Sequence, residues 1–515
     1  METNQYCGEN KEMVNQYDVL IIGAGVSGIG MACQLAAQCP GKRIGILERR
    51  KSIGGTWDLF RYPGVRSDSD MLTYGFSFRP WTSTTVFADG PSIKSYLTET
   101  ARERGIDKKI RFSLRISRCE WTNSEQRWTV TAVDEDSGEA HQFTSNFLIA
   151  ATGYYNHDQG YLPSFPNVER FKGQCIHPQQ WPEGLDYKGK RVVVVGSGAT
   201  AVTIVPAMAP DAAHVTMLQR SPSYLFSFPG YDGSSAALNR VLPNRWTYAL
   251  LRRRNIWLQR FIYKGCRRFP RLARKLLLGA TRRRLGPDFD MSHFSPDYQP
   301  WDERLCVVPD GDLLKALRDG KASVVTDHIE TFTERGIALK SGREIEVDIV
   351  VTATGLQLQT LGGIELKIDG KVTRLNERMT YKGVLLEDTP NFAYLIGYTN
   401  ASWTLKLDMA TDYVCRLLKE MDRRRVGSVT PRAASGELQD DGILDSVRAG
   451  YIQRGGGALP RQGRDVPWRV FHNYEWDRAM FRKPIEDPAL EWMRPAALTF
   501  IRKDKTPGAS KQRVA

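Results

Sequence analysis

A chain of 515 residues with 41% hydrophobic, 10% aromatic and 25% charged residues is too long for one ordinary core. Two or three packed units are expected, and the composition excludes a disordered or fibrous protein. The formal net charge of +14 is local, because residues 239–287 hold fifteen Lys or Arg and no acidic residue.

The N-terminal stretch METNQYCGENKEM is polar and lacks the basic and apolar regions of a secretory signal. No apolar run reaches the roughly 18 residues that suggest a membrane-spanning helix. Eight cysteines are scattered without a Cys-x-x-Cys pair. This pattern indicates a reducing cytoplasm and argues against a zinc site or a disulfide framework, so no metal is expected.

Residues 17–50, YDVLIIGAGVSGIGMACQLAAQCPGKRIGILERR, predict a buried strand, a glycine turn, a helix and a second strand. Gly23, Gly25 and Gly28 form Gly-x-Gly-x-x-Gly, which permits a tight turn, close approach of a pyrophosphate and close packing of the helix. The positive end of the helix dipole would face the phosphates. An acid, Glu48, stands 20 residues after Gly28, as a dinucleotide site requires.

The pattern returns in residues 190–222, KRVVVVGSGATAVTIVPAMAPDAAHVTMLQRSP. Here Gly196, Gly198 and Ala201 form Gly-x-Gly-x-x-Ala between an apolar strand and a helix. The first glycines of the two loops are 173 residues apart. Such a repeat predicts two nucleotide-binding domains and not a solenoid.

The second strands of the two units are followed by charges of opposite sign. Glu48 lies 25 residues after Gly23, and Arg220 lies 24 residues after Gly196. A carboxylate accepts hydrogen bonds from ribose hydroxyls but repels a 2′-phosphate, which an arginine followed by Ser221 suits. The first site is therefore predicted to hold FAD and the second NADPH. The alternative for Arg220 is a solvated surface residue.

Two further apolar strands end in Ala-Thr-Gly, in SNFLIAATGYY (145–155) and VDIVVTATGLQ (347–357), and are predicted to be the crossovers between the domains. The predicted fold is α/β with two Rossmann-like dinucleotide-binding domains and a helical insert in the second. Residues 1–160 are expected to begin the FAD-binding domain. Residues 161–374 would form the NADPH-binding domain, with a basic helical insert at about 225–290, and 375–515 a return to the FAD domain and a C-terminal region.

The segments GGTWDLFRYPGVRSDSD (54–70) and FKGQCIHPQQWP (171–182), with the two Ala-Thr-Gly strands, resemble flavin-dependent class B monooxygenases of the Baeyer–Villiger type. That family's fingerprint, Phe-x-Gly-x-x-x-His-x-x-x-Trp-Pro, is met by Phe171, Gly173, His177, Trp181 and Pro182. The segments beginning WDERLC (301) and IGYTNASWTLK (396) resemble the bacterial branch of ethionamide-activating and long-chain alkane monooxygenases. The resemblance covers nearly the whole chain and fades after about Arg425.

The resemblance implies that NADPH reduces FAD, that O2 adds to give a C4a-peroxyflavin, and that a hydrophobic substrate is oxygenated. Relatives imply ketone-to-ester insertion, oxidation of sulfur compounds or attack on long-chain alkanes. A fixed positive charge would stabilise the peroxide and oxyanion. By resemblance that cation is Arg304, with Asp68 as its partner; the alternative is an ordinary interdomain salt bridge. Glu303 stands where many Baeyer–Villiger enzymes carry a Lys.

The resemblance also assigns cofactor contacts. FAD would meet Ser27, Glu48, Thr56, Trp57, Asp58, Leu59 and Ile116. NADP⁺ would meet Arg66, Ser67, Asp68, Ser197, Gly198, Ala199, Thr200, Ala201, Val202 and Thr203. His177, in a stiff linker, would couple cofactor binding to domain movement, with a catalytic base as the alternative. The alternative for Trp57 is core packing.

Residues 250–286, LLRRRNIWLQRFIYKGCRRFPRLARKLLLGATRRRLG, place Leu, Ile, Trp and Phe among arginines at helical spacing. We expect a helical excursion of the NADPH domain that caps a substrate tunnel. Its basic face is either solvated or in peripheral contact with an anionic membrane at the inner face. No nucleic-acid-binding motif accompanies the charge.

Two other classes share parts of this pattern. Disulfide reductases need a redox Cys pair near the flavin, and GGTWDLFRYPG contains no cysteine. An NADPH oxidase-like flavoprotein or a redox-sensing binding module, which releases peroxide without an oxygenated product, remains the alternative function. The sequence specifies neither the substrate nor an oligomeric state.

Overall fold

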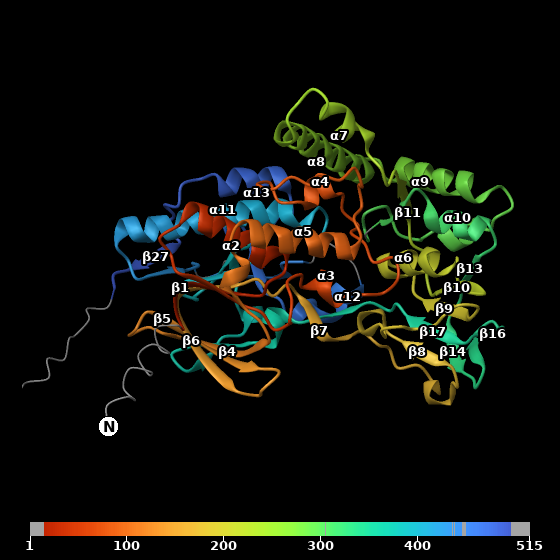
Figure 1. Ribbon diagram of the computed structural model, residues 1–515, viewed down its shortest axis with the longest axis horizontal. Helices are drawn as coiled ribbons and strands as arrows, with labels where there is room; N and C mark the ends of the chain where they lie inside the picture. Colours follow the sequence, from red (N-terminus) through yellow and green to blue (C-terminus); the bar gives the residue numbers. More distant parts are fainter. Residues whose placement is uncertain (1–14, 304, 435, 437, 445–449, 496–515) are drawn as a thin grey trace, which may run out of the picture.

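The computed structural model describes residues 15–303, 305–434, 436, 438–444 and 450–495. Two sheets lie side by side, each with helices on it, and a helical unit projects above them (Figure 1). Both Gly-rich loops connect a buried parallel strand to a helix. The predicted α/β fold with two Rossmann-like units is confirmed.

The first sheet is built around β1 (Gln16–Ile22), which pairs in parallel with β2 and β6. Val19 and Ile21 pack among the helices, whereas Leu20 and Ile22 pack toward β4 and β5, because successive side chains of a strand point to opposite faces. The other strands of this sheet are β2 (Ile44–Leu47), β3 (Ile110–Arg111), β4 (Leu114–Thr122), β5 (Arg127–Asp134), β6 (Ala140–Ala150), β19 (Glu365–Ile368), β20 (Lys371–Val372), β21 (Thr380–Tyr381), β22 (Leu385–Leu386) and β23 (Phe392–Tyr394). Its helices are α2 (Val26–Gln38), α3 (Thr56–Leu59), α4 (Met71–Tyr74), α5 (Gly90–Glu103) and α11 (Trp403–Arg424).

The second sheet is parallel throughout, in the order β13-β10-β9-β17-β8. Its central strand β9 is a run of valines buried on both sides, as a parallel sheet covered on both faces requires. The strands are β8 (Gln174–Ile176), β9 (Arg191–Val195), β10 (His214–Gln219), β13 (Ala322–Thr326) and β17 (Ile349–Thr352), with helices α6 (Ala199–Met208) and α10 (Asp312–Arg318). A small antiparallel sheet of β14 (Ile329–Phe332), β15 (Gly336–Leu339) and β16 (Glu344–Glu346) follows β13.

The chain passes between the two sheets directly after each Ala-Thr-Gly. Strand β7 (Tyr155–Gly160) follows the first motif and β18 (Leu356–Leu358) follows the second. The two pair antiparallel and form the link between the units. Each predicted crossover therefore lies at this link.

The basic insert comprises β11 (Leu225–Phe228), α7 (Gly233–Leu238), α8 (Asn244–Arg268) and α9 (Pro270–Leu285), and β12 (Cys306–Pro309) pairs with β11. Helix α8 leaves the second unit and lies on α4 of the first. The guanidinium of Arg252 donates to the carbonyls of Leu72, Thr73 and Gly75 and pairs with Asp408 of α11 at 2.8 Å. The insert thus bridges both units, although the sequence placed it within the second.

The C-terminal part returns to the first unit. Its elements are β24 (Ser428–Pro431), β25 (Leu438–Gly442), α12 (Gly450–Gly455), β26 (Arg461–Gly463), α13 (Tyr474–Phe481) and β27 (Leu490–Met493). Within the described ranges, every helix is too short or too polar to cross a membrane.

Candidate functional site

A cavity of about 950 Å³ lies between the two units, at the carboxyl ends of β1 and β9. Open α/β sheets bind ligands at this position, where loops from neighbouring strands diverge. Both Gly-rich loops contribute to its wall, so one cavity joins the two predicted nucleotide sites. Most predicted cofactor contacts line it: Gly23, Gly25, Ser27, Glu48, Thr56, Trp57, Arg66, Ser67, Asp68, Ile116, Gly196, Ser197, Gly198, Ala199, Thr200, Thr203, Arg220 and Ser221.

Some predicted residues lie elsewhere. The cavity wall does not include Gly28, Asp58, Leu59, Ala201 or Val202. The proposed catalytic Arg304, and with it the pairing of Arg304 with Asp68, lies outside the described residues.

The two Gly-rich loops are braced in the same way. Gly23 has φ +101°, and a Cβ there would lie 2.7 Å from the carbonyl oxygen of Ala151. Gly196 has φ +137°, and its Cβ would lie 2.4 Å from the carbonyl oxygen of Ala353. Ala151 and Ala353 are the alanines of the two Ala-Thr-Gly motifs. Each motif therefore packs against the backbone of its own nucleotide loop, which only glycine permits.

Glu48 is fixed with its carboxylate at the cavity wall. Oε2 accepts from the amide of Ala24 at 2.6 Å, and Oε1 accepts from the amide of Arg50 at 2.8 Å. Burial raises the pKa of Glu48, and these two hydrogen bonds act in the opposite direction. A carboxylate accepts about four hydrogen bonds, so both oxygens retain capacity for ribose hydroxyls.

Arg220 extends from the end of β10 at the other side of the cavity, beside a cluster of hydroxyls. Ser197 Oγ donates to the carbonyl of Ser221, and Ser223 Oγ donates to Ser197 Oγ, each at 3.0 Å. Glu303 shares this wall. Burial raises its pKa, and the Arg220 guanidinium acts in the opposite direction. A cation with hydroxyls suits a phosphate, and the carboxylate weakens that field.

Asp58 supports the FAD loop from behind the cavity. Its carboxylate accepts from Arg50 Nε at 2.6 Å, Ser52 Oγ at 2.7 Å and Lys94 Nζ at 2.6 Å. Burial opposes ionisation, but the hydrogen bonds from Lys94, Ser52 and Arg50 prevail and lower the pKa of Asp58 to about 2. The residue is an ionised anchor for the turn that begins α3.

Aromatic side chains position the floor of the first site. Trp57 lines the cavity and donates from Nε1 to the hydroxyl of Tyr74 at 2.7 Å, while also packing against the core. Trp403, at the start of α11, donates from Nε1 to Ser27 Oγ at 2.9 Å. Both roles considered for Trp57 are thus compatible with its position.

Arg66 holds a polar group that no described residue satisfies. Its Nη1 pairs with Asp312 of α10 at 2.5 Å, which ties the 54–70 segment to the second unit. Its Nη2 is buried in the cavity wall without a protein partner. A buried donor in this state costs free energy unless a ligand meets it, so Arg66 fits a polar or anionic cofactor group.

His177 lies at the link between the units and is absent from the cavity wall. Its Nε2 is 3.2 Å from the carbonyl oxygen of Gly355, and Nδ1 accepts from the amide of Gln179 at 3.1 Å. Nε2 therefore carries the proton and donates. The ring also packs on Gly160, where a Cβ would lie 1.9 Å from Cε1. Burial lowers the pKa of His177, so the ring is neutral at pH 7.

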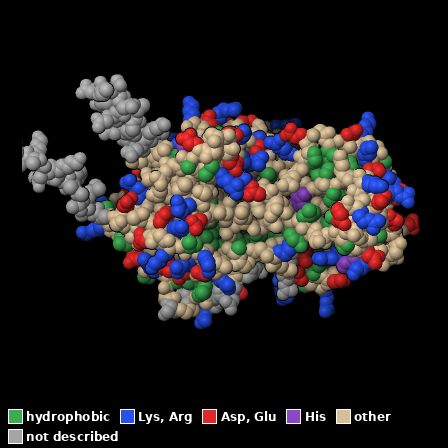
Figure 2. All heavy atoms as spheres, turned by 90° about the horizontal axis from the view of Figure 1, so that it is seen from below, with side chains coloured by type: hydrophobic (Ala, Val, Ile, Leu, Met, Phe, Trp, Pro, Cys, Tyr) green, Lys and Arg blue, Asp and Glu red, His purple; other side chains and the backbone are tan. Residues whose placement is uncertain are grey.

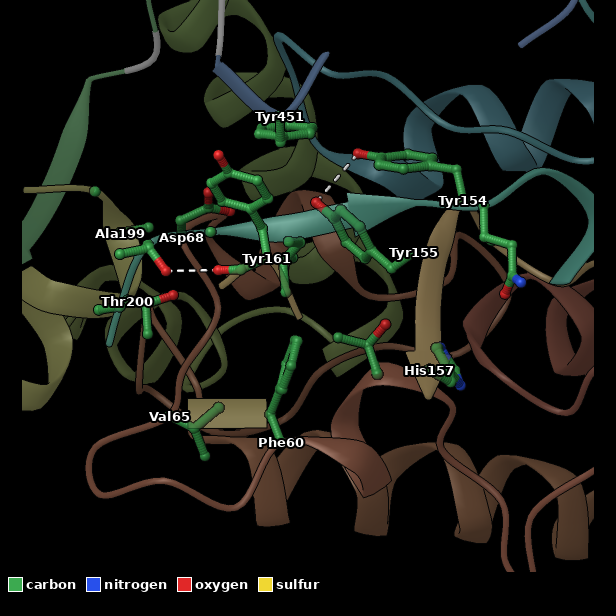
Figure 3. A pocket seen from close by; sticks show the side chains of 18 of the residues that line it. Phe60, Val65, Asp68, Tyr154, Tyr155, His157, Tyr161, Ala199, Thr200 and Tyr451 are labelled. Carbon is green, nitrogen blue, oxygen red and sulfur yellow. Dashed lines mark hydrogen bonds between the residues drawn. The ribbon is translucent and has the colours of Figure 1, made fainter. Parts of the chain in front are cut away.

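Sequence reasoning missed the aromatic side of the cavity. Figure 3 shows Tyr154, Tyr155 and Tyr161 gathered on one side with Tyr451, facing Phe60 and Val65. The Tyr154 and Tyr155 rings lie 4.5 Å apart at 63°, and Arg454 stacks on Tyr161 at 3.6 Å. The signal for two of them was present, because Tyr154 and Tyr155 directly follow the first Ala-Thr-Gly, whereas Tyr161 comes directly after the end of β7. Tyr451 and Arg454 come from α12, which carries no motif.

Three comparisons place this architecture among known proteins. A model described as flavin-binding monooxygenase-like matches residues 16–361. The putative FAD-containing monooxygenase MymA of Mycobacterium tuberculosis is 58% identical over 489 residues, 94% of this chain and 99% of its own length. The probable FAD-binding monooxygenase AlmA of Acinetobacter baylyi is 50% identical over 495 residues, 96% and 99% of the two chains. The FAD-containing monooxygenase EthA of Mycolicibacterium smegmatis is 50% identical over 488 residues, 94% and 99%.

Solved structures agree at the level of the fold. An oxidized steroid monooxygenase bound to NADP superposes with a TM-score of 0.73 at 23% identity, covering 93% of this chain and 100% of that one. Open cyclohexanone monooxygenase gives 0.67 at 21% identity, covering 81% and 90%. With the family model spanning both nucleotide loops and relatives at 48–58% identity along their whole length, the chain belongs to the flavin-binding monooxygenase-like family.

Proposed function

We propose that this flavin-dependent monooxygenase contains FAD, takes electrons from NADPH and uses O2 to oxygenate hydrophobic small molecules. The observation that carries the proposal is that two residues of opposite charge line one cavity: Glu48 in the first unit and Arg220 in the second. The names of the relatives MymA, AlmA and EthA include FAD, which supports the assignment of the first site.

FAD fits the first site. The amides at the start of α2 would face its pyrophosphate, and the remaining lone pairs of Glu48 would accept from its ribose hydroxyls. Ser27, Thr56, Trp57 and Ile116 would complete the contact. When bound and reduced, FAD supplies the oxygen-activating chemistry, and the protein supplies position, charge and exclusion of water.

NADPH fits the second site. The free amides of Ala199, Thr200 and Ala201 in the first turn of α6 would face the pyrophosphate, and the Arg220 cation, followed by Ser221, would meet the 2′-phosphate. The buried Arg66 Nη2 offers a further donor where the two cofactors would approach each other.

We assign residues 1–160 and 375–515 to the FAD-binding part and 161–374 to the NADPH-binding part. The return of β19 to β23 to the first sheet supports this division, although β19 and β20 join that sheet already at 365. Arg304 with Asp68 is the proposed catalytic pair, and the position of Asp68 on the cavity wall supports it.

The aromatic side of the cavity supports an apolar substrate. Phe60, Tyr155, Tyr161 and Tyr451 offer ring surface with few charges, which suits a ketone, a sulfur compound or a long alkyl chain. Oxygenation at sulfur or beside a carbonyl is chemically easier for a flavin oxidant than attack on an unactivated C–H bond.

One experiment separates this function from that of a peroxide-releasing oxidase or redox sensor. The purified holoenzyme is incubated with NADPH and a long-chain ketone or the matching alkane, and NADPH, product and H2O2 are measured together. Product that matches the NADPH consumed supports the monooxygenase. Stoichiometric H2O2 without an oxygenated product from either substrate would contradict it.

We also propose a cytoplasmic location, with peripheral contact of the basic insert at the inner face of the membrane. Among the described residues, the cysteines form no disulfide: Cys33, Cys39, Cys119, Cys266, Cys306 and Cys415 are buried, and Cys175 is exposed. Seven thiols without a disulfide suit a reducing compartment.

A further inference from the structure

We propose that the outward face of α8 docks on a bilayer containing anionic phospholipid, and that the cavity draws apolar substrate from that bilayer. The docking stands on the surface itself. The substrate route rests on the proposed monooxygenase function.

The surface is an exposed apolar stripe on α8. Trp246, Leu250, Trp257 and Phe261 are 65%, 51%, 64% and 62% exposed, and the Trp257 and Phe261 rings stack at 5.2 Å. At about 100° per residue these four positions fall within about 60° of one another around the helix. Nine of the sixteen large hydrophobic side chains exposed among the described residues lie between positions 241 and 276. Clustering of this kind marks an interaction surface.

The opposite side of α8 fixes this orientation. Tyr248, Leu251, Arg252 and Asn255 are buried. Arg252 binds three backbone carbonyls of the first unit, and Asn255 Nδ2 donates to Asp70 at 2.9 Å. Rotation of the helix would break this network, so the stripe faces outward in the folded protein.

Charge selects the partner. Residues 239–287 hold fifteen Lys or Arg and no acid; Lys264 and Arg268 fall within the arc of the apolar stripe, and Arg253 lies about 20° beyond its edge. Several of the insert's cations pair with no carboxylate of the described chain: Arg245, Arg253, Arg268, Arg271, Lys275, Arg282 and Arg283. Aromatic side chains among unpaired cations match the boundary between anionic headgroups and acyl chains.

A second copy of the chain fits this surface poorly. A two-fold contact would bring the same patch onto itself and oppose its cations without an acid between them. Figure 2, which views the molecule from the side opposite α7 and α8, shows Lys and Arg interspersed with Asp and Glu. That face therefore lacks the unmixed positive charge of residues 239–287.

The apolar stripe continues into the next helix. Phe269 separates α8 from α9, is 57% exposed and has Arg268 over its ring at 5.3 Å. On α9, Leu272 and Leu276 are 55% and 64% exposed and lie one turn apart. The apolar surface thus extends over both long helices of the insert.

The buried side of α8 packs on α4, a helix that contributes to the cavity wall. Arg252 holds the carbonyls on both sides of Tyr74, and Tyr74 lines the cavity and accepts from Trp57. A bilayer seated on the outward face of α8 is therefore separated from the flavin end of the cavity by α8 and the short helix α4, which suits a substrate dissolved in lipid.

The test is flotation of the FAD-loaded protein with vesicles. Vesicles of phosphatidylcholine alone are compared with equal parts of phosphatidylcholine and phosphatidylglycerol, in about 50 mM and about 500 mM NaCl. We expect flotation only with the anionic vesicles at low salt. Failure to float under those conditions, or equal flotation with both compositions, would overturn the proposal.

Two variants test the two components of the surface. Trp257→Ser with Phe261→Ser removes the centre of the stripe, and Arg253→Glu with Arg268→Glu reverses two unpaired cations. Each is expected to weaken binding to anionic vesicles at least about tenfold. The matched controls, Val372→Ser and Arg335→Glu, change equally exposed residues outside the insert and should bind as wild type. Unchanged binding of both insert variants contradicts the surface, as does tighter binding of a single-stranded polynucleotide than of vesicles.

The substrate route has its own readout. A long-chain ketone in anionic vesicles and a short soluble ketone are given to wild type and to the Trp257→Ser, Phe261→Ser variant. We expect about a tenfold loss with the vesicle-borne ketone alone. An equal loss with both ketones overturns the route. Absence of product from wild type with either ketone, with flotation intact, contradicts the monooxygenase function and leaves the docking surface supported.

Discussion

Glu48 and Arg220 occupy equivalent positions in the two nucleotide-binding units, and we propose that they select the different cofactors. Glu48 directly follows β2, and Arg220 directly follows β10, each the second strand of its βαβ unit. On the proposed assignment, the adenosine ribose of either nucleotide would meet the same structural position. The sign of one side chain would then decide whether a 2′-phosphate is accepted.

Arg220→Ala is expected to lower the preference for NADPH over NADH by about 10- to 100-fold in kcat/KM. A charge-assisted hydrogen bond to phosphate contributes about 1.5–3 kcal/mol, and each 1.4 kcal/mol is about tenfold. Glu303→Gln should shift the preference in the opposite direction, because it removes a carboxylate from the same wall. Arg335→Ala, outside the cavity, is the control. An unchanged ratio in Arg220→Ala would remove that residue from cofactor selection.

Asp58→Asn tests the ionised anchor behind the FAD loop. The folded-state pKa of about 2 lies below the ordinary 3.8, so ionised Asp58 stabilises the protein above pH 4 by about 2 kcal/mol. That contribution falls to about half by pH 3, because the unfolded chain takes up the proton first. Thermal unfolding from pH 7 to pH 3 should show the gap between wild type and variant narrowing with acid. A gap independent of pH would contradict the assignment.

At the scale of single residues, the sequence predicted the features that depend on the spacing of residues within a short motif. The glycines, Glu48 and Arg220 belong to short motifs, and the structure places Glu48, Arg220 and the first two glycines of each loop around one cavity. The support of Asp58 by Lys94 comes from a helix 36 residues away, and Tyr451 comes from a segment 255 residues after Gly196 of the second loop. Contacts of that range depend on how the units pack and leave no local pattern.

Helix α8 has a buried face and an exposed face, and both carry arginines. The fifteen cations of the insert look alike in the sequence, yet Arg252 is buried against the first unit while its neighbour Arg253 is exposed. Helical periodicity predicted the helices correctly. It could not identify which arginine meets backbone carbonyls, because those carbonyls belong to α4, some 180 residues earlier.

Arg252→Met should destabilise the protein by about 3–5 kcal/mol, because it leaves Asp408 without its cationic partner and removes the guanidinium donor from three buried carbonyls, of which that of Thr73 keeps a bond from Thr404. Arg253→Met on the same turn is expected to change stability by less than about 0.5 kcal/mol. Differential scanning calorimetry of both variants measures the difference. Similar melting temperatures for the two would show that α8 is not anchored through Arg252.

At the scale of the whole molecule, His177 lies at the β7–β18 link between the two units. Its ring packs on Gly160 of β7, and its Nε2 donates to the carbonyl of Gly355, the residue before β18. The resemblance gave this histidine a coupling role, and its absence from the cavity wall favours that role over a catalytic base. The histidine of the fingerprint thus lies at the link between the two units.

His177→Ala is expected to retain FAD while weakening NADP⁺ binding or slowing flavin reduction about tenfold or more. The reason is that the link between the units loses the imidazole ring that contacts Gly160 and Gly355. His177→Gln, which can still donate to Gly355, should recover part of the rate. Stopped-flow reduction and NADP⁺ titration provide the readouts. Wild-type affinity and reduction rate in His177→Ala would contradict coupling.

The twin braces of Gly23 on Ala151 and Gly196 on Ala353 share no atom. Gly196→Ala, which adds one methyl group, is therefore expected to block NADPH binding at the second loop and to leave FAD bound at the first. Light or dithionite could then reduce the flavin of this variant, and its reaction with O2 could be measured without hydride transfer from NADPH. Because each nucleotide loop has its own glycine contact, one added atom could separate flavin reduction from the reaction with oxygen.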